Sequence, residues 1–141
     1  MRFLRAHAAL TRELSSRLEA LHELTLSDFD VLIQLYYADG RRMRRIDLAR
    51  SVLLTASGIT RLLDGLESSG LVAKDRCNSD ARVTYAVLTQ AGVRKIEEAR
   101  DSHLADIEEL FGSQFSPHER EQLAELLGRL PLAHTSEPCS A

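Results

Sequence analysis

The sequence predicts a mainly α-helical fold that carries one small β-hairpin. Apolar residues recur at intervals of three and four along most of the chain, which is the period of an amphipathic helix. Between residues 71 and 89 the pattern changes to an alternation around the polar loop CNSDAR, which is typical of two strands joined by a loop. A chain of 141 residues is long enough for a single domain, residues 1–141, with its own core.

The first two helices are predicted from their apolar faces. The first spans residues 2–23, with one stripe formed by Phe3, Leu10, Leu14, Leu18 and Leu21. The second is expected to begin at Ser27, because Ser27-x-x-Asp30 resembles a capping box, and to end at Asp39-Gly40. Its apolar positions are Phe29, Leu32, Ile33 and Tyr36.

Two short helices joined by a tight turn follow the basic run RRMRR at residues 41–45. The first is expected to use Ile46, Leu48, Ala49 and Val52. The second, with Thr55 as its expected N-cap, ends at Ser69-Gly70 and is expected to bury Ile59, Leu62, Leu63 and Leu66. This arrangement is a helix-turn-helix, and the hairpin that begins with LVAKDR follows it directly.

Two more helices complete the chain. Thr89 is expected to cap a helix over residues 90–111, with Val93, Ile96, Leu104, Ile107 and Leu110 on its apolar face. Ser116, Pro117 and Glu119 form a capping-box start for a last helix, which carries Leu123, Leu126, Leu127 and Leu130. That helix stops at Pro131, and residues 132–141 are expected to be a disordered tail.

Composition excludes several classes of protein. No run of about 18 apolar residues exists that would cross a membrane, and the N-terminus reads as an amphipathic helix rather than a signal peptide. Two cysteines, Cys77 and Cys139, do not make a disulfide framework, which favours a cytoplasmic location. The five histidines are scattered, and neither a catalytic set nor a cofactor motif is evident. We therefore expect no enzyme, metal or cofactor.

The charges are distributed unevenly. Residues 41–95 hold 11 Lys or Arg and 5 Asp or Glu, a net charge of +6, whereas the whole chain has −3. Residues 1–40 carry −2 and residues 96–141 carry −7. A basic centre between acidic flanks indicates that one part of the molecule binds a polyanion, although solvated helix faces would give the same count.

Three motifs, in this order, resemble the MarR family of bacterial transcription regulators. They are LARSVLLTASGITRLLDGLESSGLV at residues 48–72, D-x-R at residues 80–82 and LTQAG at residues 88–92. The resemblance covers residues 24 to about 130 and implies a winged helix-turn-helix flanked by N- and C-terminal dimerisation helices. The DNA-binding lobe would then be residues 24–95, and the dimerisation region would be residues 1–23 and 96–131.

Double-stranded DNA is the partner that the helix-turn-helix predicts. The N-terminal end of its second helix enters the major groove. With Ile59 facing inward, the expected contacts are Thr55, Ser57, Gly58, Thr60 and Arg61, because small hydroxyl residues allow close approach and Arg can bind guanine. Asp64 and Glu67, on the same helix, are expected to pair with basic neighbours.

The hairpin is predicted to act as a wing beside this helix. Arg82, at its tip, is expected to enter the minor groove, with Asp80 holding its guanidinium through charge-assisted hydrogen bonds. The alternative is an exposed turn with an incidental ion pair. Phosphate contacts are expected from Arg44, Arg45, Lys74 and Arg76.

The terminal helices would either enlarge the core of a monomer or, as the resemblance implies and as we predict, bury each other across a homodimer. The expected interface residues are Phe3, Leu10, Leu14, Leu123, Leu126, Leu127 and Leu130. Family members often bind small aromatic or phenolic acids between lobe and dimer helices, and an effector pocket here would use His7, Arg12, Tyr36 and Tyr37. The tyrosines fit equally well as ordinary core residues.

The sequence therefore predicts a homodimeric, sequence-specific repressor of a pseudo-palindromic operator, relieved by a small effector. One alternative is a winged-helix module that binds proteins and not DNA. Another is a thiol-responsive regulator acting through Cys77, whose pKa the neighbours Lys74 and Arg76 would lower, although an incidental cysteine explains the residue as well.

Overall fold

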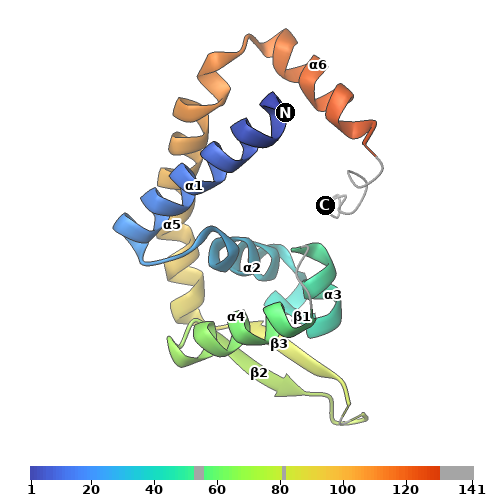
Figure 1. Ribbon diagram of the computed structural model, residues 1–141. Helices are drawn as coiled ribbons and strands as arrows, with labels where there is room; N and C mark the ends of the chain where they lie inside the picture. Colours follow the sequence, from blue (N-terminus) through green and yellow to red (C-terminus); the bar gives the residue numbers. More distant parts are fainter. Residues whose placement is uncertain (53–55, 81, 131–141) are drawn as a thin grey trace.

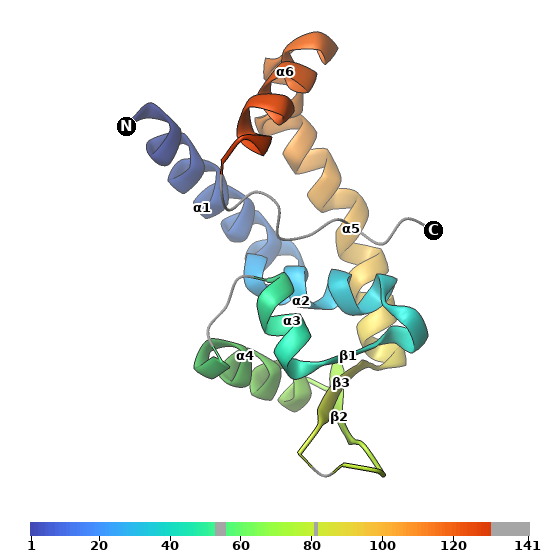
Figure 2. The same ribbon diagram turned by 90° about the vertical axis from the view of Figure 1, so that its right-hand side faces the viewer.

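The protein consists of a helical arm and a compact lobe, as the computed structural model shows for residues 1–52, 56–80 and 82–130 (Figure 1). The arm is formed by α1 (Arg2–His22), the long α5 (Gln90–Leu110) and α6 (Pro117–Gly128). The lobe holds α2 (Leu26–Tyr37), α3 (Arg45–Ser51), α4 (Ala56–Ser68) and a small sheet. Short 3-10 turns follow α2 at Asp39–Arg41 and α5 at Gly112–Gln114. The hairpin and α6 lie at opposite ends of the molecule (Figures 1 and 2).

The sheet has three antiparallel strands in the order β1-β3-β2. They are β1 (Arg42–Arg44), β2 (Val72–Arg76) and β3 (Thr84–Leu88). The hairpin of β2 and β3 was predicted, but β1 was not. The strand β1 has only three residues within an arginine run, which is too short an alternation to predict a strand. It is defined by its pairing with β3, in which Met43 lies opposite Ala86.

Local capping signals set most helix boundaries. The predicted caps Thr89 and Ser116 are confirmed, with Thr89 accepting from the backbone N–H of Gly92 at 3.0 Å. The predicted start of α2 at Ser27 is wrong. Thr25 is the cap, because its hydroxyl accepts from the N–H of Asp28 at 3.1 Å, and the Asp28 carboxylate accepts from the N–H of Thr25 at 2.9 Å.

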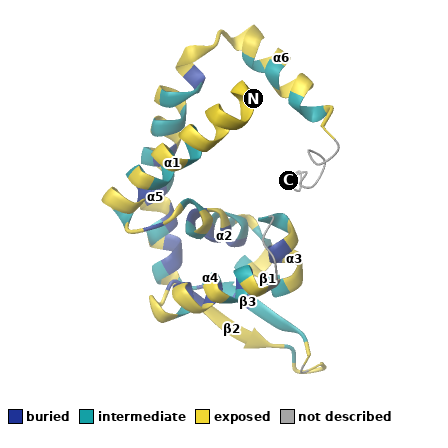
Figure 3. Ribbon diagram, viewed as in Figure 1, coloured by how far each residue is buried: buried dark blue, intermediate teal, exposed yellow. Residues whose placement is uncertain are grey.

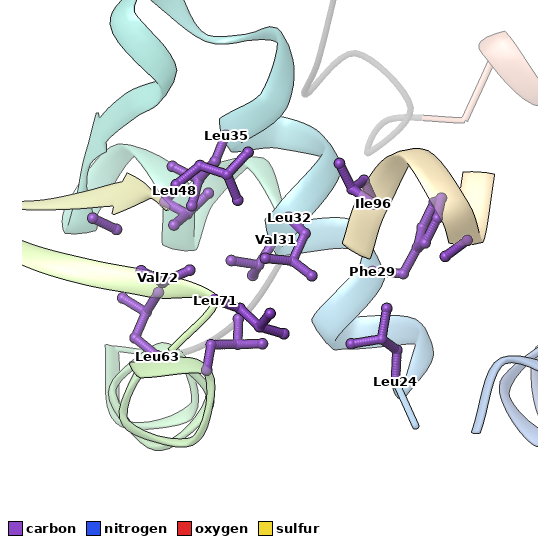
Figure 4. Close-up of a cluster of buried hydrophobic side chains, with 14 of the residues drawn as sticks. Leu24, Phe29, Val31, Leu32, Leu35, Leu48, Leu63, Leu71, Val72 and Ile96 are labelled. Carbon is purple, nitrogen blue, oxygen red and sulfur yellow. The ribbon is translucent and has the colours of Figure 1, made fainter. Parts of the chain in front are cut away.

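The hydrophobic core is centred on α2, which α3, α4, α5 and the sheet surround (Figures 3 and 4). Val31, Leu32 and Leu35 of α2 are fully buried. Several residues assigned to apolar faces are exposed instead, namely Phe3, Leu21, Ile46, Leu104, Leu126 and Leu130. The lobe therefore has its own core, while much of the apolar surface of the arm faces outward.

Polar contacts join α1 to α5 in the arm. The Arg17 guanidinium lies 2.8 Å from Asp106 and 3.1 Å from Glu109, both on α5, and 3.0 Å from Glu13 on its own helix. These carboxylates, with Glu109 contributing most, raise the pKa of Arg17. His22 Nε2 lies 2.7 Å from the Ser102 hydroxyl, so α1 contacts α5 through polar side chains at two separate places.

Gly92 lets α5 begin directly against the lobe. A Cβ at this position would lie 2.2 Å from the carbonyl oxygen of Leu71 and 2.6 Å from a methyl carbon of Leu88. We expect Gly92→Ala to lower the free energy of unfolding by about 1–3 kcal/mol, because the backbone at Leu71 must shift. Thermal denaturation measures this.

Gly65, exposed on α4, is the matched control. A Cβ there would meet nothing within 4 Å. Gly65→Ala should raise the free energy of unfolding by about 0.5–1 kcal/mol through helix propensity. A Gly92→Ala variant as stable as the wild type would show that α5 does not need this close approach.

His103 on α5 is an unexpected polar residue in the core. It is 5% exposed, its ring centroid lies 4.4 Å from that of Phe29, and its Nδ1 is buried without a hydrogen-bond partner among the described residues. Burial lowers the pKa of His103, and the nearby Asp106 opposes this only in part. The neutral imidazole is therefore the form that the fold accommodates.

This burial predicts a pH dependence of stability. Because the folded-state pKa of His103 lies below its unfolded value of about 6.5, the unfolded chain binds the proton more readily. The stabilisation is complete above that value and declines as pH falls below it. Urea denaturation between pH 7.5 and 5 should show a shallower decline for His103→Leu than for the wild type. If the stability of both proteins declined equally between pH 7.5 and 5, His103 would make no contribution to the pH dependence.

Candidate nucleic-acid interface

The recognition helix α4 presents one polar face outward. Ile59, Leu63 and Leu66 are buried against the lobe, which confirms the predicted inward orientation of Ile59. Ser57 and Arg61 are exposed on the opposite side, so both are accessible to a groove. Gly58 and Thr60 are half-buried at the flanks. The predicted contact Thr55 lies outside the described residues.

The flank of α4 that carries Thr60 is bonded to basic side chains. The guanidinium of Arg45, the first residue of α3, donates to the Thr60 hydroxyl. The Lys74 ammonium, on β2, lies 2.7 Å from Asp64 and 2.9 Å from Glu67. The prediction that these two acids pair with basic neighbours is confirmed.

Lys74, one of the expected phosphate contacts, is bonded to both of these acids. The hydrogen bonds that its ammonium donates to Asp64 and then to Glu67 raise the pKa of Lys74, and the bond from Lys74 lowers the pKa of Asp64. The ammonium thus stays charged and held between two carboxylates, next to the outward face of α4. Lys74 neutralises these acids, and its expected contact with phosphate stays a prediction.

The tip of the wing is organised by Asp80, in a different way from that expected. The Asp80 carboxylate accepts from the backbone N–H of Arg82 at 2.9 Å, and the Asp80 carbonyl accepts from the N–H of Val83 at 3.0 Å. The carboxylate therefore shapes the turn, and no ion pair to the Arg82 guanidinium is found among the described atoms. The Arg82 side chain is exposed at the tip.

Asp80 offers a direct test of this geometry. Asn can accept the same hydrogen bond from the N–H of Arg82, as in an Asx-turn, whereas Ala cannot. We expect Asp80→Asn to bind DNA within about twofold of the wild type and Asp80→Ala to bind several-fold more weakly, as measured by fluorescence anisotropy. Equal losses for both variants would instead favour a charge-dependent brace.

Arginines from three elements meet beside the recognition helix. A hollow between α3, α4 and the start of β3 is lined by Arg44, Arg45, Arg50 and Arg82, together with Ile46, Ala49, Ile59, Val83 and Thr84. This juxtaposition places the tip of the wing on the same side as the start of α3. Arg76, at the end of β2, is also exposed. Arg44, Arg76 and Arg82 are all exposed to solvent.

Sequence reasoning missed the role of Arg42. This residue crosses the outer face of the sheet, with its guanidinium carbon 4.0 Å from the Tyr85 ring centroid and its Nη2 3.2 Å from Asp75 on β2. Arg44 also hydrogen-bonds the Tyr85 side chain. The signal lay in the alternation Arg-Met-Arg, which puts both arginines on one face once β1 is recognised.

The structure does not gather the four expected effector residues within one chain. Arg12 lines a pocket between α1 and the end of α5, together with Leu10, Leu110, Phe111 and Phe115 among others. The Tyr36 hydroxyl donates to Glu97 at 3.0 Å, and Tyr37 hydrogen-bonds Arg100. His7 is exposed on α1 and does not line that pocket.

The predicted dimer residues lie on the arm, where much apolar surface is uncovered. Phe3, Leu126 and Leu130 are exposed, and no residue of α6 from Pro117 to Gly128 is buried. The remaining members are half-buried, namely Leu10, Leu14, Leu123 and Leu127. Figure 3 shows α6 standing away from the lobe.

Cys77 is half-buried at the base of the wing, with its Sγ 3.0 Å from the Ser79 hydroxyl. That hydroxyl, followed by the backbone N–H groups of Ser79 and Asp80, lowers the pKa of the thiol. The expected cause, the charges of Lys74 and Arg76, is therefore replaced by local hydrogen bonds. A thiol-sensing role stays a hypothesis.

Two further kinds of feature are absent from the described residues. No helix in the described ranges is long and apolar enough to cross a membrane. No group of three or more His, Cys, Asp and Glu in the same part of the chain could hold a metal ion.

Comparisons with known proteins agree with this geometry. The family model described as "MarR family" matches residues 24–84. The HTH-type transcriptional regulator MhqR of Bacillus subtilis is 32% identical over 111 residues, which are 79% of this chain and 74% of MhqR.

Two solved structures from Streptomyces coelicolor are similar. The MarR family transcriptional regulator AbsC is 28% identical with a TM-score of 0.85, covering 89% of this chain and 84% of AbsC. Sco3205, solved in complex with DNA, has a TM-score of 0.87 at 23% identity, covering 89% of this chain and 82% of its own. The second likeness concerns the fold alone.

Proposed function

The chain belongs to the MarR family of transcriptional regulators, and on this basis we propose that it is a homodimeric repressor that binds a pseudo-palindromic DNA operator. The observation that most directly supports this proposal is the surface formed by α4 and the wing. There the exposed Ser57 and Arg61 of α4 lie beside a hollow lined by Arg44 and Arg82. Such a surface combines groups for the major groove with cations for the backbone and minor groove.

Each recognised element has a separate part in the proposed complex. Ser57 and Arg61 contact base edges or phosphates in the major groove, with Gly58 between them in sequence on the same helix. Thr55 is proposed as a further contact from the sequence alone. Arg82 enters the adjacent minor groove, and Arg44 and Arg76 bind phosphates. A solved complex of Sco3205 with DNA supports DNA as the partner. A regulator with DNA as its partner acts in the cytoplasm, which is the location that we propose.

The arm supplies the proposed dimer. Phe3, Leu126 and Leu130 are large apolar side chains on its surface, and a two-fold partner would cover them. Two lobes related by that axis present two recognition helices about 34 Å apart, one turn of DNA, which is why we expect an inverted repeat. Occupation of such a site over a promoter is sufficient for repression. The scattered positions of His7, Arg12, Tyr36 and Tyr37 support no particular effector.

Selection from a random library tests this function. The wild-type protein is incubated with randomised 40-base-pair duplexes, and bound molecules are sequenced after several rounds. We expect an enriched inverted repeat, bound with an affinity that falls steeply between 50 and 200 mM salt through counterion release. Absence of enrichment, together with salt-independent binding, would favour the protein-interaction module instead.

A further inference from the structure

The geometry of α4 separates Thr60 from Ser57 and Arg61, with which it was grouped in the sequence as an expected DNA contact. Thr60, Asp64 and Glu67 are spaced so that they share one flank of the helix, and each is bonded to a basic side chain from another element. Ser57 and Arg61 share the outward face and are exposed. One flank therefore holds the helix to the lobe, while the outward face is the one presented to a groove.

We propose that Arg45 is a positioning residue that fixes the recognition helix through Thr60, and that it does not bind phosphate. This inference rests on the proposed function and deepens it. Arg45 is half-buried at the start of α3, immediately after β1, so its backbone is held by both elements. Its guanidinium reaches across to α4 and donates to the Thr60 hydroxyl.

The surroundings of Arg45 support this assignment. Its charge also contributes to lowering the pKa of Asp64, one turn after Thr60, which places the guanidinium along the same flank of α4. Lys74 holds the far end of that flank from β2. Contacts from α3 and β2 thus fix the helix at two points, and together they set how Ser57 and Arg61 meet the groove.

A positioning role and a phosphate contact have different signatures in DNA binding. Loss of a phosphate contact weakens all sequences alike and lowers the slope of log K against log salt by about one. Loss of a positioning contact leaves that slope unchanged and reduces the preference for the selected operator over a scrambled duplex of the same composition. The two duplexes and a salt series therefore distinguish the roles.

The test uses Arg45→Met, Thr60→Val, Thr60→Ser and the double variant Arg45→Met/Thr60→Val in the full chain. We expect Arg45→Met and Thr60→Val each to lower the operator-to-scrambled affinity ratio about tenfold, with an unchanged salt slope. The double variant should be no worse than either single variant, because both remove one contact. Thr60→Ser, which keeps the hydroxyl, should restore most of the ratio. Arg44→Met, a proposed phosphate contact, is the comparison for slope.

A measurement without DNA keeps the inference separate from the proposed function. Amide hydrogen exchange of residues 57–68 should become several-fold faster in Arg45→Met and Thr60→Val than in the wild type or in Thr60→Ser. A wild-type protein that enriches no DNA sequence would refute the proposed function alone. Unchanged exchange in both variants, or a salt slope lowered by about one in Arg45→Met, would overturn the positioning role.

Discussion

Arg82→Ala is expected to weaken binding to the selected operator by roughly 10- to 100-fold at physiological salt. The side chain stands exposed at the tip of the wing, and the Asp80 carboxylate holds the backbone and not the guanidinium. A guanidinium free to enter a narrow minor groove gains from the concentrated negative potential there. Fluorescence anisotropy with a labelled operator duplex measures the change.

Arg12→Ala is the matched control for Arg82→Ala. It removes the same charge from an exposed position on α1, far from the wing (Figure 1). We expect its affinity for the operator to stay within about twofold of the wild type, since exposed charges beyond a Debye length are screened. Sedimentation should show the wild-type mass for both variants. Unchanged operator affinity of Arg82→Ala would remove the wing from the proposed interface.

Leu126→Glu is expected to convert the proposed dimer into monomers and to lower operator affinity by 100-fold or more, roughly. Leu126 is 54% exposed on α6, so the substitution leaves the core of its own chain intact. In a dimer it would bury two carboxylates in an apolar interface, which costs several kcal/mol. A lone lobe then binds only half of the operator.

Ile46→Glu provides the control for Leu126→Glu in sedimentation. Ile46 is 60% exposed on α3, in the lobe, and is not among the predicted interface residues. Sedimentation equilibrium should give a dimer for Ile46→Glu and a monomer for Leu126→Glu, with circular dichroism unchanged in both. Dimers of full operator affinity in Leu126→Glu would exclude α6 from the interface.

Much of the fold was predictable because its signals are local. Thr89 and Ser116 each mark the start of a helix by a capping pattern that spans four residues. Ile59 was predicted to face inward from helical spacing alone. The exposed positions of Leu104 and Ile46 show the limit of periodicity. Spacing identifies an apolar face, but it does not say whether that face meets the core of the same chain or another surface.

The site was less predictable because its contacts are made between elements. From the sequence, Arg45 and Lys74 were both predicted to bind phosphate, because both are basic and near the helix-turn-helix. The structure shows one bonded to Thr60 and the other to Asp64 and Glu67. Asp80 shows what sequence spacing leaves open. Its position two residues before Arg82 was known, but the sequence could not show that its carboxylate accepts from the backbone N–H of Arg82.

Thr89 has a mechanical consequence for the whole molecule. It is the single residue between β3 and α5, and its hydroxyl donates to the carbonyl of Gly70 at 2.7 Å while capping α5. The turn after α4, the wing strand and the long helix are therefore joined at one point. With 21 residues, α5 is about 31 Å long. Tilting it by about 5° at the arm would displace the lobe by nearly 3 Å, which in the proposed dimer would change the distance between the two copies of α4.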